Sequence, residues 1–168
     1  MEIIFENNYQ YTRNMVLEYQ YKIGARRMLF WSVALIIGGI VYGIMGLVNQ
    51  DPRGYLGLGF FALAIYSAAY PYIFTKKSEK RLHQRYGGVI PVTRIQFGET
   101  IEVSEADIEF SLDYSDLQRV VVLKNGIFMS TKGRRGIMLD PDGFIKGNKD
   151  EFMPFLRKQC PNATFLTK

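Results

Sequence analysis

Two long apolar stretches, joined by a short polar link, constrain this chain more than any other feature. They cover residues 28–48 and 55–74, and neither contains a side chain that is charged near pH 7. Each is about 20 residues long, and at about 1.5 Å per residue a helix of that length spans the hydrocarbon core of a bilayer. The link, residues 49–54, contains Pro52 and two charged residues and suits a turn in water. Because unpaired backbone groups are costly in lipid, the pattern predicts a transmembrane hairpin of two helices.

The overall composition hides this division of the chain. The mean hydropathy of −0.04 averages an uncharged hairpin with a charged remainder, and the formal net charge of +5 raises the question of nucleic acid. Much of the positive excess lies beside the hairpin, so we expect a membrane surface as its partner and no nucleic acid. The single cysteine, Cys160, excludes an intramolecular disulfide.

The positions of the basic residues predict the orientation of the hairpin. They flank it on the outside as Lys22, Arg26, Arg27, Lys76, Lys77, Lys80, Arg81 and Arg85. The link between the two stretches carries Arg53 alone. Cytoplasmic loops are enriched in Lys and Arg, so both chain termini are expected in the cytoplasm.

The segments around the hairpin divide the chain further. Residues 1–27 begin with a β-like run and continue with Met15, Tyr19 and Ile23 at a spacing of four, which predicts an amphipathic helix capped by Thr12. This helix either lies in the membrane interface or packs on the cytoplasmic domain. Residues 75–87 form a basic linker or a continuation of the second helix, and the glycine pair at 87–88 marks the start of a domain over 88–168.

Small residues recur within the apolar stretches. Gly39 and Gly43 form a GxxxG pair, which lets two helix backbones approach closely. We favour a contact between the two helices of the hairpin, and a homo-oligomer interface is the alternative.

Residues 88–168 show the alternation of β-strands. The alternating or apolar segments are residues 93–97, 100–103, 107–112, 120–123, 127–131 and 137–139. Asn125 and Gly126 are typical of a tight hairpin turn. A last helix is predicted after Asn148 or Asp150, with Phe152 on its inner face. The expected class is α+β: a transmembrane hairpin, then six or seven antiparallel strands closed by a C-terminal helix.

Several packing segments resemble one known family. They are residues 113–117, 125–129, 137–140 with Phe144, and 151–156. The chain resembles the YcxB-like family of small bacterial membrane proteins, which have two adjacent transmembrane helices and a C-terminal domain like that of pleckstrin-homology proteins. The resemblance implies a pleckstrin-homology-like fold and a location in the bacterial inner membrane, and it implies no particular activity.

The chain lacks a set of residues suited to catalysis. His83 stands among basic residues, and Cys160 has no histidine near it in sequence. Asp140 to Glu151 fits three positions of a calcium loop, but Phe144 and Ile145 occupy positions that need an oxygen ligand and a glycine. We therefore expect no enzyme, cofactor or metal site.

Two basic groups are candidates for contact with anionic lipid headgroups or an acidic protein partner. One is the row Lys76, Lys77, Lys80, Arg81 and Arg85, and the other is a hairpin tip with Lys132, Arg134 and Arg135. The alternatives are a topology signal for the row and a solvated turn for the tip. The expected function is that of a non-enzymatic integral membrane protein, with a cytoplasmic domain for interaction, scaffolding or sensing of the membrane surface. The alternatives are an oligomeric channel or holin-like protein and an accessory subunit of a larger membrane complex.

Overall fold

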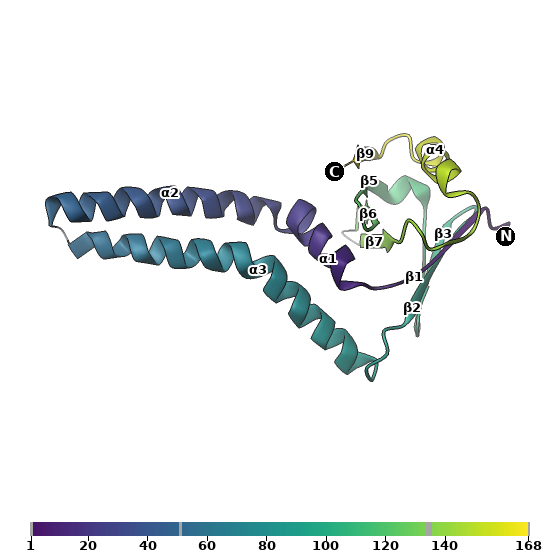
Figure 1. Ribbon diagram of the computed structural model, residues 1–168. Coiled ribbons are helices and arrows are strands. Elements are labelled where there is room, and N and C mark those ends of the chain that lie inside the picture. Colours follow the sequence, from purple (N-terminus) through teal and green to yellow (C-terminus); the bar gives the residue numbers. More distant parts are fainter. Residues whose placement is uncertain (1, 51, 134–135, 168) are drawn as a thin grey trace. The chain divides into compact units, whose positions relative to one another are not determined.

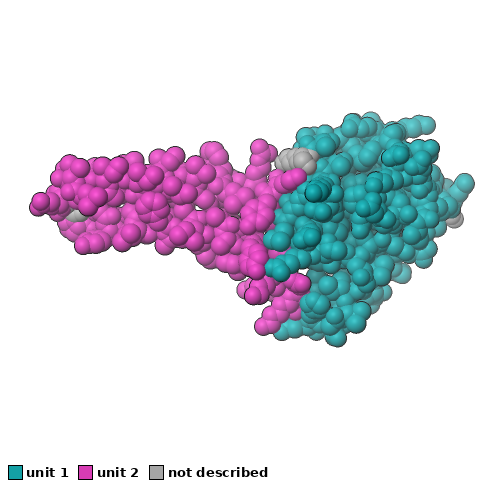
Figure 2. All heavy atoms as spheres, in the orientation of Figure 1, with its two compact units in different colours: residues 1–18, 82–168 teal, residues 19–81 magenta. Residues whose placement is uncertain are grey.

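The chain forms two compact units (Figure 2). The computed structural model describes residues 2–50, 52–133 and 136–167. One unit, the sheet unit, contains residues 1–18 and 82–168, and the other, the hairpin unit, contains residues 19–81.

The hairpin unit consists mainly of two long helices, and the first part of the second helix runs beside the first helix (Figure 1). They are α2 (Arg26–Asn49) and α3 (Leu56–Arg85), joined through the 3₁₀ turn η2 (Pro52–Tyr55). At the end of α2, Gln50 adopts a left-handed conformation, and its N–H bonds the carbonyl of Gly46. The α3 helix continues without a break through the basic stretch 75–85, so this stretch is helical and not an open linker. Both helices are long and apolar enough to cross a membrane.

Most buried positions in the hairpin unit are small and recur every seven residues. They are Ala25, Ser32 and Gly39 on one side of the hairpin and Gly57, Ala64 and Pro71 on the other; Thr75, four residues after Pro71, is also buried and lies outside this spacing. A period of 3.5 residues per turn is that of helices that coil gently around each other, and small residues let the backbones approach. The spacing of four noted in the sequence is therefore only part of a longer pattern.

A five-stranded antiparallel sheet, sheet A, contains the N-terminal strand as an inner strand. Its order is β4-β3-β2-β1-β8. The strands are β1 (Phe5–Gln10), β2 (Val92–Phe97), β3 (Ile101–Glu105), β4 (Ile108–Leu112) and β8 (Phe144–Lys146). Strand β1 pairs with β2 from Phe5 opposite Phe97 to Gln10 opposite Val92. The whole hairpin unit is thus inserted between two neighbouring strands.

This insertion changes the domain boundaries expected from sequence. The sequence predicts residues 1–27 as a segment apart from a domain over 88–168, whereas β1 supplies an inner strand of sheet A, between β2 and β8. The reason is that a strand's partner is set by tertiary pairing, and β1 and β2 lie far apart in sequence.

The second sheet, sheet B, has the order β7-β6-β5-β9. Its strands are β5 (Leu117–Val122), β6 (Ile127–Thr131), β7 (Gly136–Leu139) and β9 (Thr164–Thr167), and the 3₁₀ turn η3 (Tyr114–Asp116) precedes β5. The turn between β5 and β6 lies at residues 123–126, over the predicted segment, with Leu123 N–H bonded to Gly126 O at 2.8 Å. Its central residues are Lys124 and Asn125, and neither Asn125 nor Gly126 adopts the positive φ that is typical of an Asn-Gly turn. Strand β9 pairs parallel to β5, so the prediction of purely antiparallel strands is wrong at this edge.

One apolar core joins both sheets and the helix α4 (Lys149–Gln159). Asn148 caps this helix, because its side-chain oxygen accepts a 3.0 Å hydrogen bond from the Asp150 N–H. The Phe152 ring is fully buried and meets the rings of Phe5, Phe97 and Phe144 at centroid distances of 5.4, 4.8 and 4.8 Å. The predicted α+β class, with two long apolar helices, sheets and a C-terminal helix, is confirmed.

Candidate interaction surfaces

The basic residues of α3 form an exposed row on one side of this helix. The row consists of Lys76, Lys77, Lys80, Arg81 and Arg85, all exposed. Because residues four apart share a helix face, continuation of α3 brings these side chains together. Thr75 lies on the other side, buried, with its hydroxyl donating a 2.8 Å hydrogen bond to Pro71 O. The arrangement offers several cations to a negatively charged surface.

The basic tip between β6 and β7 is described only in part. Lys132 is exposed, and its backbone N–H donates to Asp116 O at 2.9 Å. Arg134 and Arg135, which the sequence singled out with it, lie outside the described residues.

A charge cluster that the sequence did not reveal lies on the outer face of sheet A. Arg94 Nε donates a 2.6 Å hydrogen bond to Glu6 Oε1, and Gln96 Nε2 donates one of 3.1 Å to Glu6 Oε2. Glu6 is only 6% exposed, and the hydrogen bond from Arg94 is the main cause that lowers the pKa of its carboxyl. Glu6 and Arg94 are 88 residues apart, so no local pattern could have joined them.

A wide groove of about 410 Å³ lies beside this cluster, across β2, β3 and β4. Its polar lining consists of Arg94, Gln96, Glu102, Ser104, Glu109 and Ser111. Of these, Ser104 and Glu109 lie opposite each other on β3 and β4. The face is polar and presents two exposed carboxylates, those of Glu102 and Glu109.

The N-terminal helix α1 (Arg13–Tyr19) is tied to the turn between β5 and β6. The Glu18 carboxylate accepts hydrogen bonds of 2.9 Å from Lys124 N–H, 2.8 Å from Asn125 N–H and 2.8 Å from Asn125 Nδ2. Met15 of the same helix is buried. Thr12 caps the N-terminus of α1 as predicted, because its hydroxyl oxygen accepts a 3.4 Å hydrogen bond from the Met15 N–H. Of the two placements left open by the sequence, α1 therefore packs on the sheet unit. A π-helical turn, η1 (Gln20–Gly24), follows it and leads to α2.

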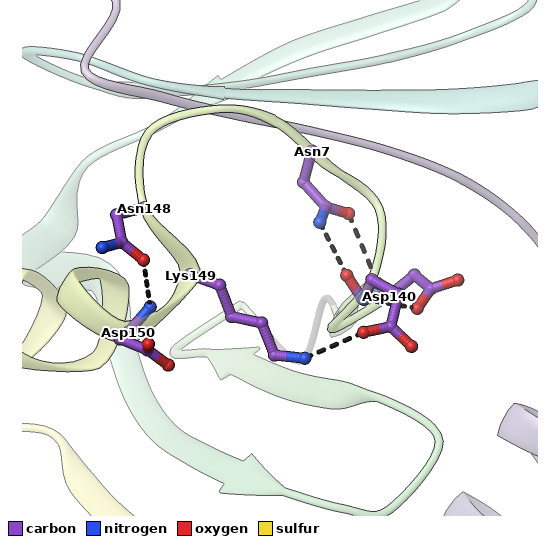
Figure 3. A network of polar contacts seen from close by, with 6 residues as sticks. Asn7, Asp140, Asn148, Lys149 and Asp150 are labelled. Carbon is purple, nitrogen blue, oxygen red and sulfur yellow. Dashed lines mark hydrogen bonds and ion pairs between the residues drawn. The ribbon is translucent and has the colours of Figure 1, made fainter.

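The acidic segment before α4 uses its oxygens to hold a turn (Figure 3). Buried Asn7 donates to Asp140 O at 2.7 Å and accepts from Asp140 N–H at 3.3 Å. Asp140 Oδ1 accepts from Asp142 N–H, and the Asp142 carboxylate pairs with Lys149 at 2.8 Å. In the part of the chain that the structure describes, no three His, Cys, Asp or Glu side chains are grouped to hold a metal ion.

The two remaining candidates for chemistry have structural surroundings. His83 Nδ1 lies 3.0 Å from Gly88 O at the end of α3. Cys160 is 2% exposed, and burial raises the pKa of its thiol to about 11, so it is protonated near neutral pH. Burial likewise raises the pKa of the neighbouring Tyr114 hydroxyl, which donates to Gly98 O at 3.1 Å.

Comparison with known proteins gives one match. Neither the curated proteins nor the solved structures contain a match to the chain. Residues 98–156, which run from just before β3 to near the end of α4, match the family described as YcxB-like protein. The resemblance seen in the sequence is thereby confirmed for residues 98–156, which are similar to the YcxB-like family.

Proposed function

We propose that this is a non-enzymatic integral membrane protein whose hairpin anchors the sheet unit at the cytoplasmic side of a bacterial inner membrane. The observation that carries the proposal is the exposure of the apolar helices. Only 11% of the most apolar 18-residue stretch of α2 and 17% of that of α3 is buried. A core helix of a water-soluble protein would be mostly buried, whereas helices in a bilayer expose apolar side chains to lipid.

The topology of the chain supports placing both termini on one side of the membrane. Residues 1–18 and 82–168 belong to one folded unit, joined through the pairing of β1 with β2. A folded unit cannot be divided by a bilayer, so an even number of spans is required between its two parts. The basic residues outside the hairpin favour the cytoplasm as that side.

The role proposed for the sheet unit is that of an interaction, scaffolding or membrane-surface-sensing module of pleckstrin-homology-like type. Two sheets with a shared core and a helix packed by Phe152 support this comparison. The basic row of α3 is the proposed contact with anionic headgroups, with about 1 kcal/mol of attraction for each basic residue near the surface.

The membrane location is tested by fractionation of cells that produce the full chain. We expect the protein to stay with membranes after a high-salt, alkaline wash and to leave them only in detergent. A tag after the last residue should react with an impermeant reagent only in broken cells. Recovery in the aqueous fraction, or labelling in intact cells, would contradict the anchor or its orientation.

The role of the basic row is tested on the purified protein in neutral detergent. Added anionic lipid should raise the unfolding temperature of the wild type and have little effect on Lys76→Gln/Lys77→Gln/Lys80→Gln/Arg81→Gln. The matched control instead replaces four exposed basic residues of the sheet unit by Gln: Arg119, Lys124, Lys146 and Lys158. An equal response of both variants would show that overall charge, and not the row, accounts for lipid binding.

A further inference from the structure

The strands at the ends of the two sheets differ in how well they are protected against pairing. Strand β8 has three residues and a register shift in its pairing with β1, and β7 and β9 have four residues each. Strand β4 has five residues and pairs with β3 over all five without a shift. Short strands, bulges, prolines and lysines are the usual devices that prevent an edge from adding another strand. Of these end strands, β4 is the longest, and its described residues include no bulge, proline or lysine; its one charged side chain is that of Glu109.

The side chains of β4 alternate between two faces. Ile108, Phe110 and Leu112 point to the core side, where Phe110 and Leu112 pack against the core and Ile108 remains 38% exposed. Glu109 and Ser111 point outward into the groove. A strand added to this edge would therefore cover apolar surface on one face and meet a carboxylate and a hydroxyl on the other.

We propose that a second copy of this chain pairs its β4 antiparallel to this β4, centred on Phe110, and extends sheet A across both copies. In this register Ile108 faces Leu112 of the second copy, and Glu109 faces its Ser111. All five residues of each strand are paired, and the pairs are apolar with apolar or charged with neutral. Such cross-strand pairs are the unit that stabilises a sheet.

Charge selects this register over its neighbours. A two-fold axis perpendicular to the sheet keeps core-facing side chains of both copies on one face and outward-facing side chains on the other. In such a pairing, one residue must lie opposite the same residue of the second copy, and this residue is the centre of the register. Centring on Glu109 places two Glu109 carboxylates opposite each other, and centring on Ser111 places Glu109 opposite Asp113. Like charges directly opposite are destabilising. In the register centred on Phe110, Asp107 of one copy faces Asp113 of the other just outside the five paired residues. Repulsion between these two carboxylates keeps the pairing from extending beyond β4.

The pairing can be tested by disulfide formation between two differently tagged full-length chains in the same membranes. One chain carries Glu109→Cys and the other Ser111→Cys, both at exposed positions. Opposite residues have Cβ atoms about 4.5–5.5 Å apart, close to the separation that a disulfide needs. Two chains that both carry Glu109→Cys would instead place their thiols diagonally, at about 7–8 Å. Mild oxidation should give several-fold more linked dimer from the mixed chains than from either variant alone.

The chain offers a matched control on the neighbouring strand. Glu102 and Ser104 have the same residue types at the same spacing on the outer face of β3, one strand away from the edge. Chains with Glu102→Cys and Ser104→Cys should form no more dimer than wild type, whose one thiol is buried. Equal linkage in the β3 pair and the β4 pair, or no excess in the mixed β4 chains, would overturn the proposal.

A second measurement uses charge without new thiols. In the proposed dimer, residue 109 of each copy faces residue 111 of the other. Ser111→Glu therefore places two carboxylates opposite each other at both of these pairs, whereas Ser111→Gln adds similar volume without charge. Light scattering in detergent should show a lower dimer fraction for the Glu variant than for the Gln variant, with the difference reduced at high salt. Identical dimer fractions would contradict this register. The proposed pairing of β4 does not depend on membrane insertion. Cell fractionation tests the membrane anchor, and disulfide formation tests the pairing of the strands.

Discussion

At the scale of single residues, the close contact between the two helices of the hairpin depends on glycines. A Cβ added to Gly57 would lie 2.8 Å from the carbonyl oxygen of Gly39 and 3.1 Å from the backbone nitrogen of Gly43. A Cβ on Gly43 would meet none of the described neighbouring atoms within 4 Å. Both members of the GxxxG pair therefore approach Gly57, but they differ in space: a Cβ on Gly39 would lie 3.2 Å from Gly57 O, whereas Gly43 leaves room for a side chain.

Gly57→Ala is expected to separate the two helices locally and to destabilise the hairpin by about 1–3 kcal/mol, the usual range for overpacking. Gly59→Ala is the matched control, since its Cβ would meet none of the described atoms within 4 Å and alanine favours a helix. Thermal unfolding in detergent measures both. Equal stability of the two variants would show that the close approach of the backbones has no energetic weight.

Glu6 gives the sheet unit a dependence on acid pH. Its folded pKa is lowered from 4.5, chiefly by Arg94, so the charged carboxylate is favoured in the folded state. The resulting stability is present above the pKa of the unfolded chain and is lost as the pH falls through the folded pKa. The unfolding temperature of the wild type should drop more steeply below about pH 4.5 than that of Glu6→Gln. Parallel curves for the two proteins would assign the acid sensitivity to other groups.

At the scale of elements, α1 is held to the sheet unit at one turn. The Glu18 carboxylate accepts three hydrogen bonds from Lys124 and Asn125, and the π-helical turn η1 follows two residues later in the chain. The turn at Asn125 and Gly126 thus has a second role besides reversing the chain, because it fixes the helix that leads into α2.

Glu18→Ala should lower the free energy of unfolding by about 1.5–3 kcal/mol, the range for hydrogen bonds to a charged group. Glu18→Gln keeps one acceptor oxygen and should fall between the alanine variant and the wild type. Hydrogen exchange at the amides of Lys124 and Asn125 locates the effect. Unchanged exchange at these two amides in Glu18→Ala would contradict the contact.

At the scale of the whole molecule, the insertion of the hairpin between β1 and β2 decides which fragments can fold. A chain of residues 88–168 lacks β1, so β2 and β8 lose their shared neighbour and the core loses Phe5. A chain that joins residues 1–18 to 82–168 through a flexible linker keeps every strand. Loop-closure entropy grows slowly with length, so a linker of about 20 residues is tolerable.

The joined chain should therefore be soluble without detergent and unfold cooperatively, whereas residues 88–168 alone should aggregate. Near-ultraviolet circular dichroism and size-exclusion chromatography distinguish the two outcomes. Cooperative unfolding of 88–168 alone would show that β1 is dispensable, and that the sheet is complete from residue 88 onward.

Local patterns in the sequence were sufficient for several elements. The two apolar stretches appear as α2 and α3, Asn125 and Gly126 form the predicted turn, and Asn148 and Thr12 cap the predicted helices. Each of these elements depends on residues that are close together in the chain, so a short stretch of sequence contains the interactions that determine it. The basic row of α3 belongs to the same group, since a helix brings residues four apart together without further information.

Only the tertiary structure decided which strands pair and what lies beside the groove. The place of β1 between β2 and β8, the parallel strand β9 and the pairing of Glu6 with Arg94 all join residues that are far apart in the chain. Such contacts depend on which surfaces meet when the core forms, because strand pairing is set by burial and register over the whole sheet. The sequence by itself determined two exposed apolar helices with basic flanks, and folding determined that they interrupt one sheet and leave β4 at its edge.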